Sequence, residues 1–322
     1  MTKDLGKRVF ANSFFNFVSF FINRFGGLFF TIIVARALEP ELFGLYNLAL
    51  SITLIVLTFA NFGIDEALAR YVARSYQKNP GKAKAYFDYL LKLKAIALSG
   101  GALILIVLAK PLSNFYDNPQ LSFPLIISAL YLILMPLSQF FSSLFYTFQK
   151  VDIYLIKETL FQAARILLLP MLILFSFSNL VNGVFTILII ASIASLIFSF
   201  IVLKKRYGFL FQKQEQKKIE KKELFNYLKF LSLGSITGIL LVYVDVLFLG
   251  KFVSLEYVGF YKAASNIILS LTALISIAPV LYPVFAQIKG KKMDLVFNKI
   301  IYYTSIISIP ATLGLIFIGK HL

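Results

Sequence analysis

Long runs of apolar residues, separated by short polar connections, follow one another along the whole chain. About 20 helical residues cross a bilayer core of roughly 30 Å, so runs of this length predict membrane-spanning helices. A backbone in lipid must satisfy its own hydrogen bonds, and these runs are too long for barrel strands. The pattern therefore predicts an all-α polytopic membrane protein. Nine spans are expected, over residues 10–35, 43–63, 90–109, 122–148, 154–176, 181–203, 228–249, 257–285 and 296–318.

One short segment occurs twice, each time between the end of one apolar run and the start of the next. Residues 38–50 read LEPELFGLYNLAL, and residues 253–265 read VSLEYVGFYKAAS. Four pairs are identical at a constant offset of 215 residues: Glu41 and Glu256, Gly44 and Gly259, Tyr46 and Tyr261, Ala49 and Ala264. Repeats of this kind in a membrane transporter indicate two homologous helical bundles with a substrate site between them.

The repeat also predicts a domain organisation. Six predicted spans separate the two copies, an even number, so both copies run in the same direction through the membrane. We expect a first six-helix lobe over residues 1–207, a basic cytoplasmic linker over 208–227 and the first three helices of a second lobe over 228–322. If the lobes are alike, the second lobe is truncated and the chain is incomplete.

Charge follows the connections. The chain contains 32 Lys and Arg residues against 15 Asp and Glu, and most of the basic residues lie on alternate connections between spans. Positive residues accumulate on cytoplasmic loops, which predicts a multi-pass protein of the cell membrane with its N-terminus in the cytoplasm. The same charge favours contact with anionic membrane lipid, and no nucleic-acid partner is expected. In the linker we expect an amphipathic surface helix that places Phe209, Leu210, Phe211 and Ile219 at the membrane interface.

Composition removes several classes of function. The chain has no cysteine and one histidine, which excludes disulfides, thiolate metal sites and histidine metal clusters. No nucleophile with an adjacent base and no phosphate-binding loop can be found along the sequence. We therefore expect neither an enzyme nor a bound cofactor or metal.

Polar residues inside the spans are the candidate functional residues, because a charge at mid-bilayer normally faces a cavity or a partner. In the first span Asn16, Ser19, Asn23 and Gly27 recur at steps of three or four residues and share one helical face. Arg24 lies at the edge of that face. The pattern favours the lining of a substrate cavity; the other interpretations are an arginine that reaches the nearer interface or pairs with a carboxylate.

The fifth span carries a second polar stripe. Glu158, Gln162 and Arg165 fall at positions i, i+4 and i+7, which place them on one side of a helix. They are candidates for binding substrate, although a structural network between Glu158 and Arg165 explains the spacing equally well. Lys157 is expected to extend to the cytoplasmic interface.

Asp245 is the acidic residue of the seventh span. An acid at that position can neutralise a cavity arginine, bind a coupling proton or sodium ion, or lie near the outer end of its helix. Transport coupled to a proton gradient, a sodium gradient or the membrane potential is therefore an expectation that attaches to this residue.

Three stretches resemble the polysaccharide-transporter family, which contains the lipid-linked oligosaccharide flippases of the multidrug/oligosaccharidyl-lipid/polysaccharide exporter superfamily. They are VARALEPELFGLYNLALSI at 34–52, FGIDEALARYVAR at 62–74 and DVLFLGKFVSLEYVGFYKAASNI at 245–267. The resemblance implies two six-helix lobes arranged as a V around a central cationic cavity. It also implies alternating access, with a polyprenyl-diphosphate-linked oligosaccharide as the cargo that moves from the cytoplasmic to the outer leaflet.

Within this family Arg24 occupies a first-helix position where related lipid flippases have a functional arginine. Glycosyltransferases or a polymerase of the same pathway are the partner proteins that the resemblance implies. Two other functions stay open, a cation-coupled multidrug exporter of the same superfamily and a non-transporting membrane scaffold. The arginine in span one favours an anionic cargo, because a guanidinium makes paired, charge-assisted hydrogen bonds to phosphate.

Overall fold

The described residues of the chain form an all-helical structure. A computed structural model describes residues 2–174, 179–212, 218–275 and 291–318. The α-helices are α1 (Thr2–Asn61), α2 (Ile64–Tyr76), α3 (Pro80–Phe115), α4 (Ser122–Thr147), α5 (Val151–Leu167), α6 (Met171–Leu174), α7 (Leu180–Arg206), α8 (Lys221–Phe252), α9 (Leu255–Ile275) and α11 (Lys291–Ile318). Two 3₁₀ turns, η1 (Pro119–Leu121) and η2 (Gly208–Leu210), complete the order.

Five helical stretches in the described part of the chain are long and apolar enough to cross a membrane. They are Ala11–Tyr76, Pro80–Phe115, Pro119–Thr147, Leu180–Arg206 and Lys221–Phe252. The prediction of an all-α membrane protein is therefore confirmed, whereas the number of nine spans stays a prediction.

The chain divides into two compact units, Met1–Ala263 and Ala264–Leu322. The first unit contains α1 to α8 and the start of α9, and the second contains the rest of α9 together with α11. The predicted lobes and the linker over 208–227 were inferred from the internal repeat. They are a different division from these two units and remain predictions. All the sites described below lie in the first unit.

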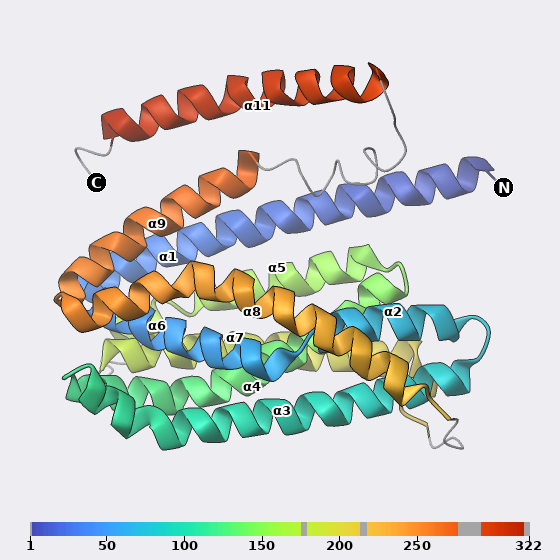
Figure 1. Cartoon of the computed structure of the whole chain (residues 1–322), viewed down its shortest axis with the longest axis horizontal. Helices are drawn as coiled ribbons and strands as arrows, with labels where there is room; N and C mark the ends of the chain where they lie inside the picture. The colour runs from blue at the N-terminus through green and yellow to red at the C-terminus, as the bar shows by residue number, and fades with distance from the viewer. Residues whose placement is uncertain (1, 175–178, 213–217, 276–290, 319–322) are drawn as a thin grey trace. The chain divides into compact units, whose positions relative to one another are not determined.

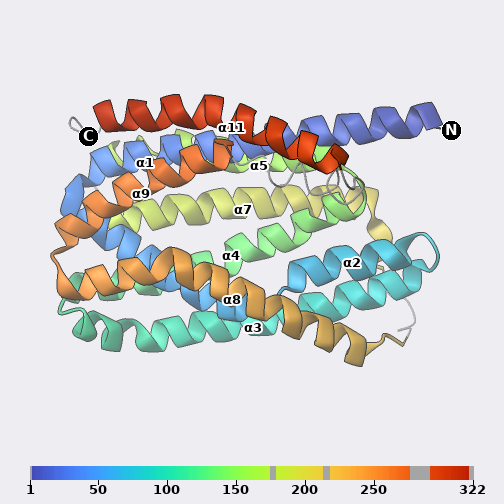
Figure 2. The same ribbon diagram turned by 45° about the horizontal axis from the view of Figure 1, so that its top comes forward.

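Helices of the first unit run lengthwise beside one another (Figures 1 and 2). Helix α4 packs between α3 and α7, while α1 packs against α5 and α8. The kink of α1, the α3–α4 connection and the α8–α9 connection lie at one end in Figure 1. The α2–α3 connection and the start of α8 lie at the other end, which the charge pattern predicts to be cytoplasmic.

Helix α1 is two helices joined at a kink. Glu39 has a left-handed φ of 62° with ψ of 164°, and Pro40 follows it. The proline ring disfavours helical geometry at the residue before it and removes one backbone donor, so the first helix ends here. Proline itself suits the first turn of the next helix. The break falls between the two predicted spans 10–35 and 43–63.

A buried ion pair ties α3 to the start of α2. The Lys94 side chain is fully buried, and its Nζ lies 2.8 Å from both carboxylate oxygens of Asp65 and also donates to Asn61. Since both charges are paired, the cluster fixes the N-terminal end of α2 against its neighbour.

The two copies of the repeat meet in the first unit. A Cβ atom built on Gly44 would lie 1.8 Å from the carbonyl oxygen of Leu255, and one on Gly259 would lie 2.1 Å from that of Pro40. Only glycine permits such an approach of two backbones. Both copies also begin a helix, because Pro40 opens the second half of α1 and Leu255 opens α9.

The start of the linker differs from the prediction of a surface helix. Leu210 is 1% exposed in the 3₁₀ turn η2, and Phe211 packs with its ring against Phe87 and Phe200. Phe209 stacks on Tyr76. The prediction was wrong for residues 208–212, because Leu210 is buried and the partly buried Phe209 and Phe211 pack on rings of α2, α3 and α7. Residues 213–217 lie outside the described residues.

Candidate functional site: the seam between α1 and α5

The polar face of α1 opens into a pocket. Its volume is about 330 Å³, and its lining consists of Asn16, Ser19, Phe20, Asn23, Arg24, Tyr146 and Tyr154. The predicted face therefore lines a hollow, as its helical spacing indicates. Tyr146 and Tyr154 come from α4 and α5, and sequence reasoning missed them because tyrosines are common in the chain.

Within this pocket the polar groups of α1 differ in their surroundings. Asn16 accepts a hydrogen bond of 3.0 Å from the Tyr146 hydroxyl, and Asn23 accepts one of 2.8 Å from the Gln162 amide. Arg24 is exposed, with its guanidinium 5.5 Å from the centre of the Phe20 ring. The arginine is thus available to a ligand in the pocket, while the two asparagines connect α1 to α4 and α5.

The stripe on α5 is buried against α1. Glu158 and Gln162 are each 6% exposed, and a buried Lys157 forms an ion pair of 2.7 Å with Glu158. Lys157 therefore does not reach the membrane interface, and that prediction was wrong, because the adjacent carboxylate holds the ammonium group inside the protein. Among the described residues no ion pair joins Glu158 to Arg165.

Arg165 has a different environment from that of Glu158. Its guanidinium lies 4.6 Å from the Phe30 ring centre and 5.3 Å from that of Phe161, the distances of cation–π contacts. Its Nε atom is buried without a hydrogen-bond partner in the described part of the structure. The same holds for the Oε1 atom of Gln162. A buried donor and a buried acceptor without partners lie one helical turn apart on this seam.

Two adjacent glycines of α1 let the α5 side chains come close. A Cβ on Gly26 would lie 2.7 Å from Oε1 of Gln162, and one on Gly27 would lie 3.4 Å from Nη2 of Arg165. The sequence placed Gly27 on the polar face, but it did not reveal that Gly26 makes room for Gln162. The Gly26–Gly27 pair within a Phe-rich helix was the available signal for a close helix contact.

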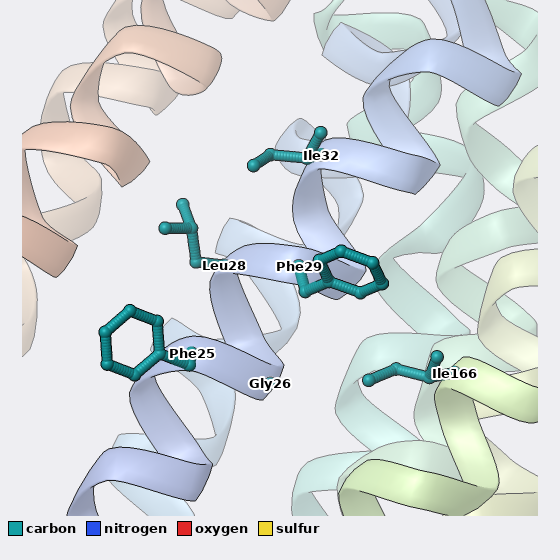
Figure 3. A pocket seen from close by; sticks show the side chains of 6 residues that line it. All are labelled: Phe25, Gly26, Leu28, Phe29, Ile32 and Ile166. Atoms are coloured by element: carbon teal, nitrogen blue, oxygen red, sulfur yellow. The ribbon is translucent and has the colours of Figure 1, made fainter.

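A second pocket, lined mainly by residues of α1, is apolar (Figure 3). It has a volume of about 340 Å³ and is lined by Phe25, Gly26, Leu28, Phe29, Ile32 and Ile166. Figure 3 shows Ile166 on α5 beside Phe29 on α1. The helical period places Phe25 and Phe29 on a different side of α1 from Asn23, so the polar and the apolar pocket share the helix but not one face.

Asp245 lies elsewhere, on α8. One carboxylate oxygen accepts a hydrogen bond from the Tyr261 hydroxyl of α9, and the other accepts one of 2.8 Å from the amide of Val246. Among the described residues no ion pair joins Asp245 to an arginine, so it does not neutralise Arg24 or Arg165 in this conformation. Lys262 stacks near the Tyr243 ring at 5.0 Å. The role of Asp245 in ion coupling stays a prediction.

In the described residues, no group of three or more His, Asp or Glu side chains is placed to hold a metal ion. The polar groups along the seam are arginines, amides and hydroxyls.

Comparison with known proteins places the chain in a family. Residues 9–289 match the family model described as polysaccharide biosynthesis protein. The chain is 28% identical over 296 residues to an uncharacterized membrane protein in the cps region of Klebsiella pneumoniae, covering 90% of this chain and 58% of that protein. It is 25% identical over 291 residues to an uncharacterized membrane protein of Methanocaldococcus jannaschii, covering 83% of this chain and 56% of that protein.

The chain thus spans somewhat more than half the length of these relatives. No solved structure matches it. The family match covers most of the chain, and the resemblance seen in the sequence is confirmed. The chain belongs to the polysaccharide biosynthesis protein family of multi-pass membrane proteins, within the multidrug/oligosaccharidyl-lipid/polysaccharide exporter superfamily.

Proposed function

We propose that this protein is a flippase that moves a polyprenyl-diphosphate-linked oligosaccharide from the cytoplasmic to the outer leaflet by alternating access. Family membership supports a role in the assembly of a polysaccharide at a membrane. The residues of α1 support this type of cargo, because hydrogen-bonding residues, the cationic Arg24 and an apolar stretch follow one another in that order along the helix.

The observation that carries the proposal is the pair of unpartnered atoms on α5. The buried Nε of Arg165 is a charged donor, and phosphate oxygens are its strongest natural acceptors. The buried Oε1 of Gln162 is an acceptor that suits a sugar hydroxyl. A cargo that carries both groups would satisfy both atoms at once. Arg24, exposed in the neighbouring pocket, would supply a second guanidinium to the diphosphate.

The apolar compartment suits the remaining part of such a cargo. Phe25, Phe29 and Ile32 are 48%, 57% and 39% exposed, and they follow Arg24 along α1. A prenyl chain that lies against them would remain in an apolar environment while its diphosphate stays with the arginines.

A cation-coupled drug exporter is less well supported. Such a transporter needs a carboxylate that faces the cargo, and Glu158, the acid of the predicted stripe, is already paired with Lys157 at 2.7 Å. A scaffold has no need of buried polar atoms without partners, which cost about 1–3 kcal/mol each. Both observations favour an anionic cargo.

Binding of undecaprenyl diphosphate to the purified protein tests the proposal, with undecaprenol as the uncharged probe. Native mass spectrometry measures the bound fraction for the parent, for Arg165→Gln and for Arg24→Gln. Because a hydrogen bond to a charged group contributes about 1.5–3 kcal/mol, each substitution should weaken diphosphate binding roughly tenfold or more.

Arg36→Gln is the matched control, since Arg36 is an exposed arginine of α1 that lines neither pocket. Equal binding of undecaprenol and the diphosphate would contradict the proposal. So would a loss of binding in the Arg36 variant as large as in the other two. Preferential binding of tetraphenylphosphonium, a lipophilic cation, would favour the drug exporter instead.

A further inference from the structure

A groove on the predicted cytoplasmic side lies between the linker and α3. Its volume is about 680 Å³, and its lining residues come from two segments far apart in the sequence. One segment is the first half of α3, and the other is the end of the linker with the first residue of α8. The groove shares no residue with the two pockets of the α1–α5 seam.

The polar part of the groove is basic. Lys92 of α3 and Lys218 and Lys221 of the linker segment line it, and all three are exposed. Asp88 also lines it, but its carboxylate already forms an ion pair of 2.7 Å with Lys84. Lys221 stacks over the Tyr89 ring, with Nζ 5.5 Å from the ring centre. The groove therefore presents three ammonium groups to a ligand and holds one carboxylate that is already paired.

The apolar part points to a ligand with a hydrocarbon chain. Leu93 and Ile96 line the groove, and Ile96 is 61% exposed. Leu103 and Val107 follow Ile96 at steps of seven and four residues on the same side of α3, and they are 62% and 64% exposed. This stripe continues the groove into the apolar stretch of a candidate membrane span. A soluble anion has no hydrocarbon part that would contact these apolar side chains.

Tyr89 and Lys92 mark the level of the interface. Tyrosines gather where the hydrocarbon core meets the headgroups, and basic pockets at cytoplasmic helix ends suit anionic headgroups. The three lysines thus lie at headgroup level, and the Ile96 stripe lies along the acyl chains.

We propose that this groove binds one anionic phospholipid of the cytoplasmic leaflet, with its phosphate among Lys92, Lys218 and Lys221 and one acyl chain along Ile96. A lipid in this position would hold the linker against α3, because two of the lysines belong to the linker segment and the third belongs to the helix. The proposal does not depend on the cargo, and it goes beyond the general attraction of basic loops to membranes.

Native mass spectrometry of the full chain in detergent tests this site. The probes are phosphatidylglycerol and phosphatidylcholine with identical acyl chains, and glycerol phosphate as the soluble competitor. We expect one phosphatidylglycerol to bind at least tenfold more tightly than phosphatidylcholine. In the triple variant Lys92→Gln, Lys218→Gln, Lys221→Gln, that binding should fall roughly tenfold or more.

A second triple variant, Lys204→Gln, Lys205→Gln, Arg206→Gln, is the matched control. It removes the same charge from exposed residues in the last turn of α7, outside the groove, and should retain the lipid. Equal losses in the two triple variants would overturn the site, as would undiminished binding in the first. Displacement of the lipid by equimolar glycerol phosphate would identify a soluble anion as the ligand and overturn the phospholipid. If the first triple variant does not fold, Lys92→Gln alone should weaken binding at least threefold, and unchanged binding in it overturns the proposal.

Discussion

Gly44 and Gly259, the corresponding glycines of the two repeat copies, lie against each other's segments in a reciprocal contact. Gly44 faces the carbonyl of Leu255, Gly259 faces the carbonyl of Pro40, and Pro40 and Leu255 are themselves 215 residues apart. When residue i of one copy contacts residue j of the other, and residue j of the first contacts residue i of the second, the two copies are related by a two-fold axis. The repeat thus has a local pseudo-two-fold axis that passes between α1 and α9.

Gly44→Ala should separate the two copies. Its Cβ would lie 1.8 Å from a backbone oxygen, and backbone cannot move aside as a flexible side chain does. We expect the substitution to destabilise this conformation by at least the 1–3 kcal/mol that is typical of overpacking. Spin labels at Glu41→Cys and Glu256→Cys, two exposed positions in a chain without cysteine, measure the separation by pulsed electron resonance.

The control for this prediction is Gly100→Ala, because nothing lies within 4 Å of a Cβ at Gly100 on α3. The label distance should increase in Gly44→Ala and Gly259→Ala and stay at the parent value in Gly100→Ala. An unchanged distance in both repeat variants would show that the reciprocal contact does not hold the two copies together.

The sequence predicted most of the helical pattern, because the length of an apolar run is a local property of the chain. It also predicted the polar faces of α1 and α5, since helical spacing places Asn16, Asn23 and Gln162 without knowledge of the packing. It could not predict that Lys157 pairs with Glu158, because residues one position apart do not normally face each other on a helix. The partly buried position of Phe211 depends on Phe200 of α7 and on Phe87, which is distant in sequence.

Gly26→Val should weaken binding of a sugar linked to undecaprenyl diphosphate although it removes no charge. A Cβ at Gly26 would lie 2.7 Å from Oε1 of Gln162, so the added side chain displaces Gln162 and its 2.8 Å hydrogen bond to Asn23. We expect at least a fivefold loss of affinity, equivalent to about 1 kcal/mol. Gly100→Val is the control in the same binding measurement, and an equal loss there would contradict the steric explanation.

Lys157→Met should be strongly destabilising because it leaves the buried Glu158 without its cation. Breaking a buried ion pair from one side costs about 3–5 kcal/mol, whereas replacing both partners with apolar residues is often neutral. Thermal unfolding in detergent should therefore show a larger loss of stability for Lys157→Met alone than for the double variant Lys157→Met, Glu158→Leu.

The control is Asp117→Asn, which breaks the exposed ion pair with Lys251. The Asp117 side chain is 82% exposed, so this substitution should cost about 1 kcal/mol or less. A single variant as stable as the double variant would contradict the importance of the buried pair.

Glu220 should attach the linker to α3 in a pH-dependent manner. Its carboxylate accepts a 2.8 Å hydrogen bond from Lys82 and one of 3.2 Å from the Tyr86 hydroxyl, and these hydrogen bonds, with that from Lys82 first, lower the pKa of the carboxyl. A carboxyl with a lowered pKa contributes stability above its ordinary pKa of about 4.3, and that stability is lost as the pH falls through the lowered value. Hydrogen exchange of residues 218–224, corrected for the intrinsic rate, should therefore show protection at pH 7 that disappears in acid.

In Glu220→Gln the protection of this segment should be weak at both pH values. Glu256→Gln changes an exposed glutamate at the opposite end of the helices and should behave as the parent. Protection in Glu220→Gln that equals the parent at pH 7 would mean that packing of Ile219 and Leu224 alone holds the linker in place.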